Sequence, residues 1–243
     1  MQSFFIALQF LTCLPIPAVD WNEKAVSRSL KYYPLVGLVI GLFLLGTSWL
    51  SSHTDPMLQA ALILGAWAII TGGLHLDGLT DCADAWVGGL GERERTLSIM
   101  KDPYCGPMGV IALVILLLIQ YSAIIALVGN EQLMVLLYIP IIARLLPSLF
   151  FMTTTYARKE GLGSSFTENS QRKPLILIIV ACSILIVLLN GAIGILLLVT
   201  ALIVFFVIRA NTIKRIGGFT GDVLGAAIVI FEASALAVIA LFI

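Results

Sequence analysis

Residues 174–208 read PLILIIVACSILIVLLNGAIGILLLVTALIVFFVI, an apolar block of 35 residues that contains no charged side chain. As a single helix, at about 1.5 Å per residue, the block would be roughly 50 Å long, whereas the hydrocarbon core of a bilayer is about 30 Å thick. We therefore predict two transmembrane helices, broken at Asn190-Gly191. This break decides how many times the chain crosses the membrane.

The rest of the chain has the same apolar character. Its 243 residues are 60% hydrophobic and 12% charged, and the mean hydropathy of +1.06 lies far outside the range of soluble domains. We expect an all-α polytopic membrane protein with about seven transmembrane helices, forming a single integral membrane domain over residues 1–243. Residues 3–14 are too short to span and are expected to form a short N-terminal interfacial helix. The other candidate spans are residues 33–51, 57–74, 107–128, 132–152 and 218–243.

The basic residues support a count of seven spans. Thirteen of the fourteen Lys and Arg residues fall in alternate connections, which seven spans place on one side of the membrane. The positive-inside rule then puts these connections and the N-terminus in the cytoplasm. The net charge is zero and no basic patch stands out, so we expect no nucleic-acid partner. The thirteen are Lys24, Arg28, Lys31, Arg93, Arg95, Lys101, Arg158, Lys159, Arg172, Lys173, Arg209, Lys214 and Arg215.

Three aspartates cluster in HLDGLTDCADAW, residues 75–86. In a helix Asp77, Asp81 and Asp84 lie within about 60° of arc, because they are spaced i, i+4 and i+7. At an effective dielectric near 20, neighbouring carboxylates repel by roughly 2 to 3 kcal/mol, and a bound divalent cation removes this repulsion. A solvated acidic helix end is the alternative. Because the positions between the aspartates are mostly apolar, we favour a metal site. Carboxylate ligands suit Mg²⁺, which often bridges to substrate phosphates.

The residues around this cluster allow more than one interpretation. His75 is a candidate metal ligand, general base or ordinary interfacial histidine. Arg93, Arg95 and Lys101 suit phosphate binding, although basic residues that flank a span also determine topology.

The last span carries two acidic residues, Asp222 and Glu232, that need a partner or a wet cavity inside a bilayer. Arg144, in the middle of span 132–152, is the one basic residue outside the connections, and an ion pair between Arg144 and Glu232 is the simplest hypothesis. Glycines at every fourth position of the span allow another helix to approach closely, within the chain or in a second copy. They are Gly217, Gly221 and Gly225.

Five segments together resemble the cobalamin synthases, also called adenosylcobinamide-GDP ribazoletransferases. The third and fifth are the specific ones. The segments are LQFLTCLPIP (8–17), YYPLVGLVIG (32–41), GGLHLDGLTDCADAW (72–86), RTLSIMKDPYCGPMG (95–109) and GGFTGDVLGA (217–226).

The resemblance implies a multi-pass enzyme of the bacterial cytoplasmic (inner) membrane with its active site facing the cytoplasm. Such an enzyme joins adenosylcobinamide-GDP to α-ribazole, or to its 5'-phosphate, forms adenosylcobalamin or its 5'-phosphate, and releases GMP with the help of Mg²⁺. The expected partners are these two substrates and membrane lipid, with a homo-oligomer as a further possibility.

The resemblance also suggests a role for each candidate residue. Mg²⁺ on the diphosphate would be held by Asp77, Asp81 and Asp84, with Asp222 completing the site. His75 or one of the aspartates would take the proton of the ribazole hydroxyl, and the diphosphate or leaving GMP would be bound by Arg93, Arg95 and Lys101.

Two other function classes use similar features. A CDP-alcohol phosphotransferase or an intramembrane prenyltransferase also combines aspartates with Mg²⁺. The residues at Asp81-Cys82 differ from the order found in CDP-alcohol phosphotransferases. A prenyltransferase would be expected to have another aspartate-rich motif. A cation transporter would use the acidic face as a selectivity site, yet we find no internal repeat of the kind that many transporters show.

Overall fold

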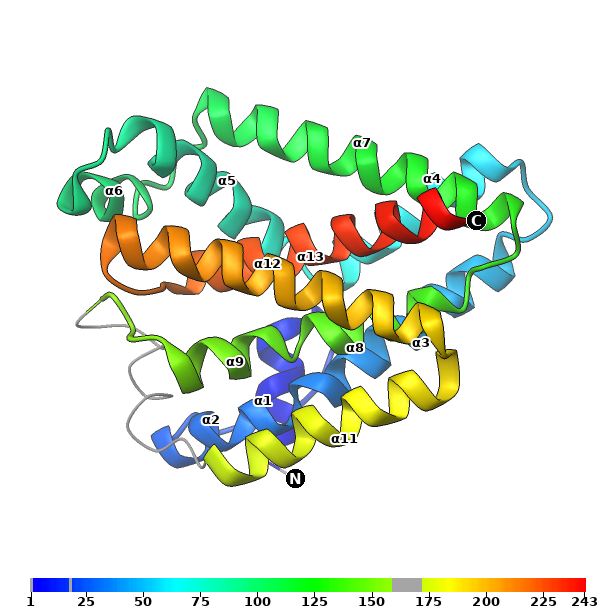
Figure 1. The fold of residues 1–243 in the computed structure, drawn as a ribbon, viewed down its shortest axis with the longest axis horizontal. Helices are drawn as coiled ribbons and strands as arrows, with labels where there is room; N and C mark the ends of the chain where they lie inside the picture. The colour runs from blue at the N-terminus through cyan, green and yellow to red at the C-terminus, as the bar shows by residue number, and fades with distance from the viewer. Residues whose placement is uncertain (1, 18, 159–171) are drawn as a thin grey trace.

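The structure, a computed structural model, describes residues 2–17, 19–158 and 172–243, and helices make up almost all of its regular secondary structure. The long helices run side by side, and the C-terminus lies at the end of the bundle opposite α6 (Figure 1). The helices are α1 Gln2–Leu11, α2 Glu23–Ser29, the 3₁₀ helix η1 Leu30–Tyr32, α3 Tyr33–Leu50, α4 Pro56–Ile70, α5 Leu74–Gly88, α6 Arg93–Ile99, α7 Pro107–Gly129, α8 Val135–Ala143, α9 Leu146–Thr153, α11 Arg172–Asn190, α12 Ala192–Ile216 and α13 Gly221–Phe242.

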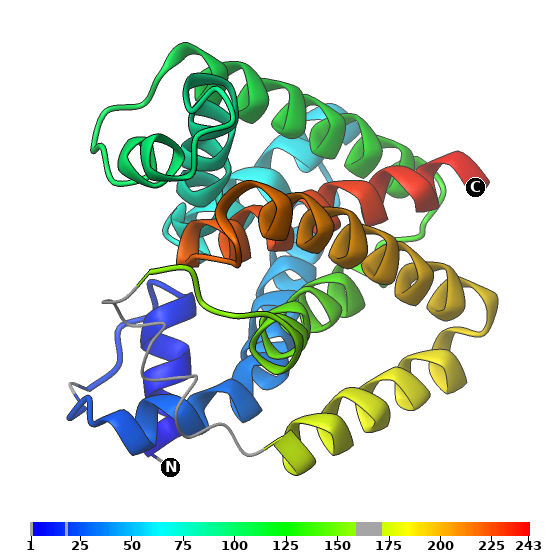
Figure 2. The same ribbon diagram turned by 60° about the vertical axis from the view of Figure 1, so that its left-hand side comes forward.

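The predicted break in the long apolar block is confirmed. Helix α11 ends at Asn190 and α12 begins at Ala192, while Gly191 between them has φ +54°, a conformation that glycine adopts at little cost. The two helices diverge from this point in a V (Figure 2). Among the described residues, six helical segments are long and apolar enough to cross a membrane, or seven if the bent pair α4–α5 counts as one span, in agreement with the expected all-α polytopic fold.

The expected span at residues 57–74 differs from the structure. Helix α4 stops at Ile70 and has 15 residues, about 22 Å, which is too short to cross the hydrocarbon core alone. Helix α5 follows at an angle of 86°. The span expected at residues 57–74 is therefore shorter than predicted, and α4 counts as a seventh crossing only together with the bent helix α5. Gly72 and Gly73 form the bend with φ of +61° and +69°.

The span expected at residues 132–152 is also divided, into α8 and α9, and Arg144 lies at the junction. Pro147 is in the first turn of α9, where its missing N–H is tolerated. The predicted ion pair between Arg144 and Glu232 of α13 is present, with both side chains buried.

The short N-terminal helix is present as α1, and its buried residues pack onto the bundle. Just beyond its end, the Cys13 N–H donates to the Ile70 carbonyl over 2.8 Å. The N-terminal segment thus contacts the bend between α4 and α5.

Candidate active site

Helix α5 carries the three aspartates on one side, as the spacing predicted. Asp77 is exposed, while Asp81 and Asp84 are half-buried. Within the described residues, the side-chain carboxylates of Asp77 and Asp81 have no hydrogen bond and no ion pair; the Asp77 backbone carbonyl accepts the Thr80 hydroxyl. These two carboxylates are therefore available to a ligand.

Asp84 already has partners. Its two carboxylate oxygens accept the Gly106 N–H over 2.7 Å and the Gly109 N–H over 2.9 Å. These amides belong to the N-terminus of α7, where a negative charge also complements the helix dipole. Asp84 thus ties α5 to α7, a role that the sequence analysis did not identify.

Asp222, in the first turn of α13, is paired with Arg158. Arg158 Nη2 lies 2.6 Å from Asp222 Oδ2, and the two side chains are 19% and 22% exposed. The Thr220 hydroxyl, which also caps α13, donates to the same carboxylate oxygen over 3.2 Å. Arg158 was not among the predicted site residues, because the sequence shows it only as one member of a basic connection.

A short backbone pairing explains why Arg158 reaches Asp222. The Phe219 N–H donates to the Thr155 carbonyl over 3.0 Å, and the Ala157 N–H donates to the Phe219 carbonyl over 2.8 Å. A Cβ on Gly218 would lie 2.2 Å from the Thr155 carbonyl oxygen, so this close approach requires glycine. The pairing holds the chain before Arg158 beside the start of α13.

Helix α5 also packs directly on α13 through glycines. A Cβ on Gly78 would lie 2.7 Å from the Asp222 carbonyl oxygen, and one on Gly225 would lie 3.3 Å from the His75 Cα. The predicted close approach is therefore confirmed for Gly225. Gly221 has no such neighbour within 4 Å, and Gly217, with φ +74°, ends α12.

The aspartate face is negative. Asp81 lies within electrostatic range of Asp77, Asp84 and Asp222, and Arg158 is the cation that opposes them. Three carboxylates around a fourth leave an excess of negative charge, which attracts a cation.

Mg²⁺ fits this face with fewer protein ligands than expected. The described residues contain no group of three or more His, Cys, Asp or Glu side chains close enough to hold a metal, so the expected set of Asp77, Asp81, Asp84 and Asp222 is not assembled. Mg²⁺ is commonly held by one or two carboxylates together with substrate phosphates and water. The available pair Asp77 and Asp81, one helical turn apart, matches that requirement.

The basic residues of the α5–α7 connection do not form ion pairs with the aspartates in the described part of the chain. Arg93 instead joins two other segments, donating from Nε to the Ile216 carbonyl over 2.8 Å and from Nη2 to the Ala157 carbonyl over 3.1 Å. Arg95 and Lys101 are exposed. Their predicted role on the diphosphate stays a prediction.

His75 does not share the aspartate face. It is 4% exposed and lines a narrow cavity with Trp67 and Glu232, whereas Asp77 faces a different cavity. Two residues along a helix correspond to a rotation of about 200°, which accounts for the opposite directions.

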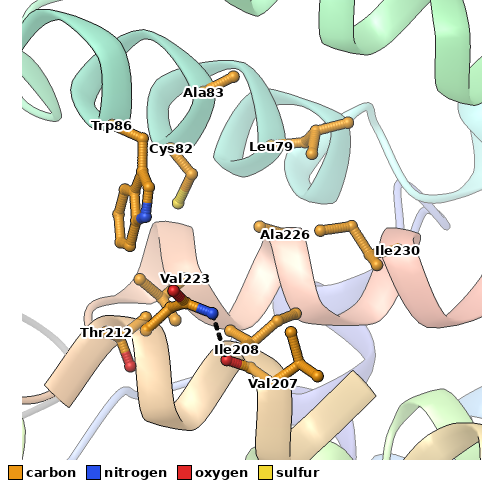
Figure 3. A pocket seen from close by; sticks show the side chains of 11 residues that line it. Leu79, Cys82, Ala83, Trp86, Val207, Ile208, Thr212, Val223, Ala226 and Ile230 are labelled. Carbon is orange, nitrogen blue, oxygen red and sulfur yellow. Dashed lines mark hydrogen bonds between the residues drawn. The ribbon is translucent and has the colours of Figure 1, made fainter. Parts of the chain in front are cut away.

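Two of the larger cavities beside α5 bear on the site. One, of about 520 Å³, is lined by Asp77 and Thr80 together with Gly72, Gly73 and Cys105. The other, of about 410 Å³, is an apolar groove between α5, α12 and α13, with Leu79, Cys82 and Trp86 on one side and Ile208 on the other (Figure 3). Helix α5 thus presents Asp77 to one space and apolar side chains to another.

Comparisons with known proteins agree on one family. The family model described as "Cobalamin-5-phosphate synthase" matches residues 3–240. The chain is 46% identical to the adenosylcobinamide-GDP ribazoletransferase of Pseudomonas savastanoi pv. phaseolicola over 243 residues, 99% of this chain and 100% of the relative. It is 46% identical to the protein of that name from Acinetobacter baumannii over 237 residues, 96% of this chain and 94% of the relative. The protein of that name from Pseudomonas aeruginosa is 43% identical over 243 residues, 99% of this chain and 98% of the relative. No solved structure matches the chain.

Proposed function

The chain belongs to the cobalamin-5-phosphate synthase family, and we propose that its aspartate helix joins adenosylcobinamide-GDP to α-ribazole, or to its 5'-phosphate, in a reaction that depends on Mg²⁺. The activity is that of an adenosylcobinamide-GDP ribazoletransferase, which completes the nucleotide loop of cobalamin. Family membership also decides between the function classes that the aspartate pattern left open.

The proposed reaction is one phosphoryl transfer. A ribose hydroxyl of α-ribazole attacks the phosphorus next to cobinamide, a new P–O bond forms, the bond to the GMP phosphate breaks, and GMP leaves. The hydroxyl proton passes to a carboxylate or to His75. His75 is buried and points away from Asp77 around the helix. Both observations support an aspartate of α5 as the proton acceptor.

Asp77 and Asp81 are the residues that we propose to hold Mg²⁺ against the diphosphate, in the cavity of about 520 Å³ beside Asp77. Bound there, the ion supplies charge neutralisation on the phosphoryl oxygens. Asp84 and Asp222 have structural roles in this proposal. Asp84 fixes α7 beside α5, and Asp222 orients Arg158 at the edge of the site. Arg158 joins Arg93, Arg95 and Lys101 as a candidate for the diphosphate or the leaving GMP.

We also propose that the site faces the cytoplasm of a bacterium from its inner membrane. The support is the distribution of basic residues, which gather in the connections at one end of the bundle. Contact with membrane lipid and association into a homo-oligomer stay predictions.

The single observation that carries the proposal is the pair of neighbouring carboxylates without a side-chain partner, Asp77 at a cavity and Asp81 one turn further along α5, in a chain of this family. Release of GMP from adenosylcobinamide-GDP tests it, with purified protein in liposomes and with or without α-ribazole and Mg²⁺. We expect GMP only when both are present. GMP release that is unchanged after complete removal of divalent cations would contradict the metal assignment, while no release under any condition would contradict the activity.

A further inference from the structure

A buried polar cluster lies on the side of α5 that faces away from the aspartates. Arg144 is 0%, Glu232 2%, and both His75 and Trp67 4% exposed. They come from the α8–α9 junction, α13, α5 and α4, so the cluster joins four parts of the chain that are far apart in sequence. The ion pair between Arg144 and Glu232 gives a partner to one Arg144 nitrogen and to one Glu232 oxygen.

Several polar atoms of this cluster lack a partner. Within the described residues, His75 Nε2, Trp67 Nε1 and the Arg144 Nε and Nη2 atoms are buried and make no hydrogen bond. Trp67 Nε1 lies near Glu232 but without good hydrogen-bond geometry. Buried polar groups in native proteins nearly always have a partner, and a bilayer offers no bulk water to supply one.

A narrow cavity lies where three of these side chains meet. The polar residues that line it are Trp67, Thr71, His75, Gln120 and Glu232, and its volume is about 10 Å³. That space is close to what one water molecule needs, and a buried water typically has two to four polar partners. A cation is disfavoured, because the Arg144 guanidinium already neutralises Glu232 and the Trp67 N–H can only donate.

We propose that one ordered water occupies this cavity and bridges His75 to Trp67 and Glu232, so that His75 is a positioning residue. The water accepts a hydrogen bond from Trp67 Nε1 and donates one to the Glu232 carboxylate. It forms a third hydrogen bond with His75 Nε2. Because the His75 backbone already contacts Gly225, this bridge fixes the first turn of α5 against α13. Asp77 and Asp81 follow on the same helix, so their placement depends on the bridge.

Substitutions that keep or remove the hydrogen-bonding group test the bridge. His75→Gln retains an amide that can reach the water, and His75→Leu fills a similar volume without a polar atom. Trp67→Phe removes the indole N–H together with part of the ring, so its own loss of packing is measured in the single variant. We expect His75→Leu to lower the midpoint of thermal unfolding and to reduce kcat more than tenfold, with little change in KM. His75→Gln should retain at least tenfold more turnover than His75→Leu and the wild-type pH profile. The matched control is His53→Leu, at an exposed histidine of the α3–α4 connection, and should change neither quantity.

The double variant separates a shared water from two independent effects. If one water joins the two side chains, the loss of unfolding temperature in the double variant His75→Leu with Trp67→Phe should be clearly smaller than the sum of the losses in the two single variants. Additive losses of thermal stability, or a density map of the wild-type protein that shows ordered water elsewhere but none in this cavity, would overturn the proposal. Equal inactivity of His75→Gln and His75→Leu, with loss of one limb of the pH profile, would make His75 the base instead. The activity readout depends on the proposed transferase function, but the unfolding temperatures and the density map do not, so the two proposals fail separately.

Discussion

At the scale of single residues, the four carboxylates expected to act together have different surroundings. Asp84 is bound to two backbone amides and Asp222 to Arg158, while Asp77 and Asp81 have no partner in the described part of the chain. The crowding of Asp81 by three other acids is unfavourable without a cation. A crowded carboxylate without a side-chain partner is a sign of function rather than of stability.

Asp81→Asn tests this distinction. Removal of the charge takes away a proposed metal ligand, so we expect turnover in liposomes to fall on the order of 100-fold or more. The same change relieves repulsion, so the thermal unfolding midpoint without Mg²⁺ should stay the same or rise. Asp20→Asn, at an exposed aspartate before α2, is the control and should leave both unchanged. Near wild-type turnover of Asp81→Asn would rule out the assignment.

Much of the site could be predicted from sequence because local spacing determines it. The shared face of Asp77, Asp81 and Asp84 follows from helical periodicity, and the pairing of Glu232 with Arg144 follows from the need to neutralise charge in a bilayer. Arg158 could not be predicted in this way, because it reaches Asp222 only through the pairing of residues 155–157 with Phe219, a contact between segments more than sixty residues apart.

At the scale of helices, the same contrast holds. The helix break at Asn190-Gly191 could be predicted because the apolar block is longer than the membrane is thick. The bend after α4 could not, because it lies inside an apolar run whose length suits one span. Gly72-Gly73 was visible in the sequence, but two glycines alone do not distinguish a bend from close packing. The contact of Cys13 with Ile70 at this bend is a tertiary feature.

The contact of α5 with α13 depends on Gly78, and Gly78→Ala tests it. A Cβ there would lie 2.7 Å from the Asp222 carbonyl oxygen and 3.1 Å from the Asp222 Cα, both backbone atoms that cannot move alone. We expect a destabilisation of about 1 to 3 kcal/mol and a loss of turnover of about tenfold or more, as overpacking separates the helices. Activity at the wild-type level would show that the two helices need not touch at this point.

Gly65→Ala is the matched control, because no atom lies within 4 Å of a Cβ at that position of α4. The same substitution there should be neutral or stabilise the helix by up to about 1 kcal/mol. Thermal unfolding and GMP release, measured side by side for the two variants, separate a specific helix contact from a general effect of replacing glycine.

At the scale of the whole molecule, the ends of the bundle have different compositions. At one end, the connections at residues 51–55, 130–134 and 191 contain no Lys or Arg. At the other end, hydrogen bonds from arginines join the connections at 89–106 and 217–220 and the helix ends that flank them. These arginines are Arg93, Arg158 and Arg215. Lys159 lies outside the described residues. The bend after α4 is held by the Cys13 N–H, which donates to the Ile70 carbonyl, while the C-terminal end of α5 reaches the basic end, where Arg215 donates to the Trp86 carbonyl.

This arrangement predicts the orientation of the protein in the cell membrane. In a variant whose four cysteines are replaced by alanine, Ser52→Cys in the α3–α4 connection should react with a membrane-impermeant maleimide added to intact spheroplasts. Ser98→Cys in α6 should react only after the membrane is permeabilised, because both serines are exposed but lie at opposite ends of the bundle. GMP release in inverted vesicles serves as the functional control: externally added adenosylcobinamide-GDP should be consumed there and not by right-side-out vesicles. The reverse labelling pattern would place the aspartate face outside the cytoplasm, away from the compartment in which we propose that its substrates are bound.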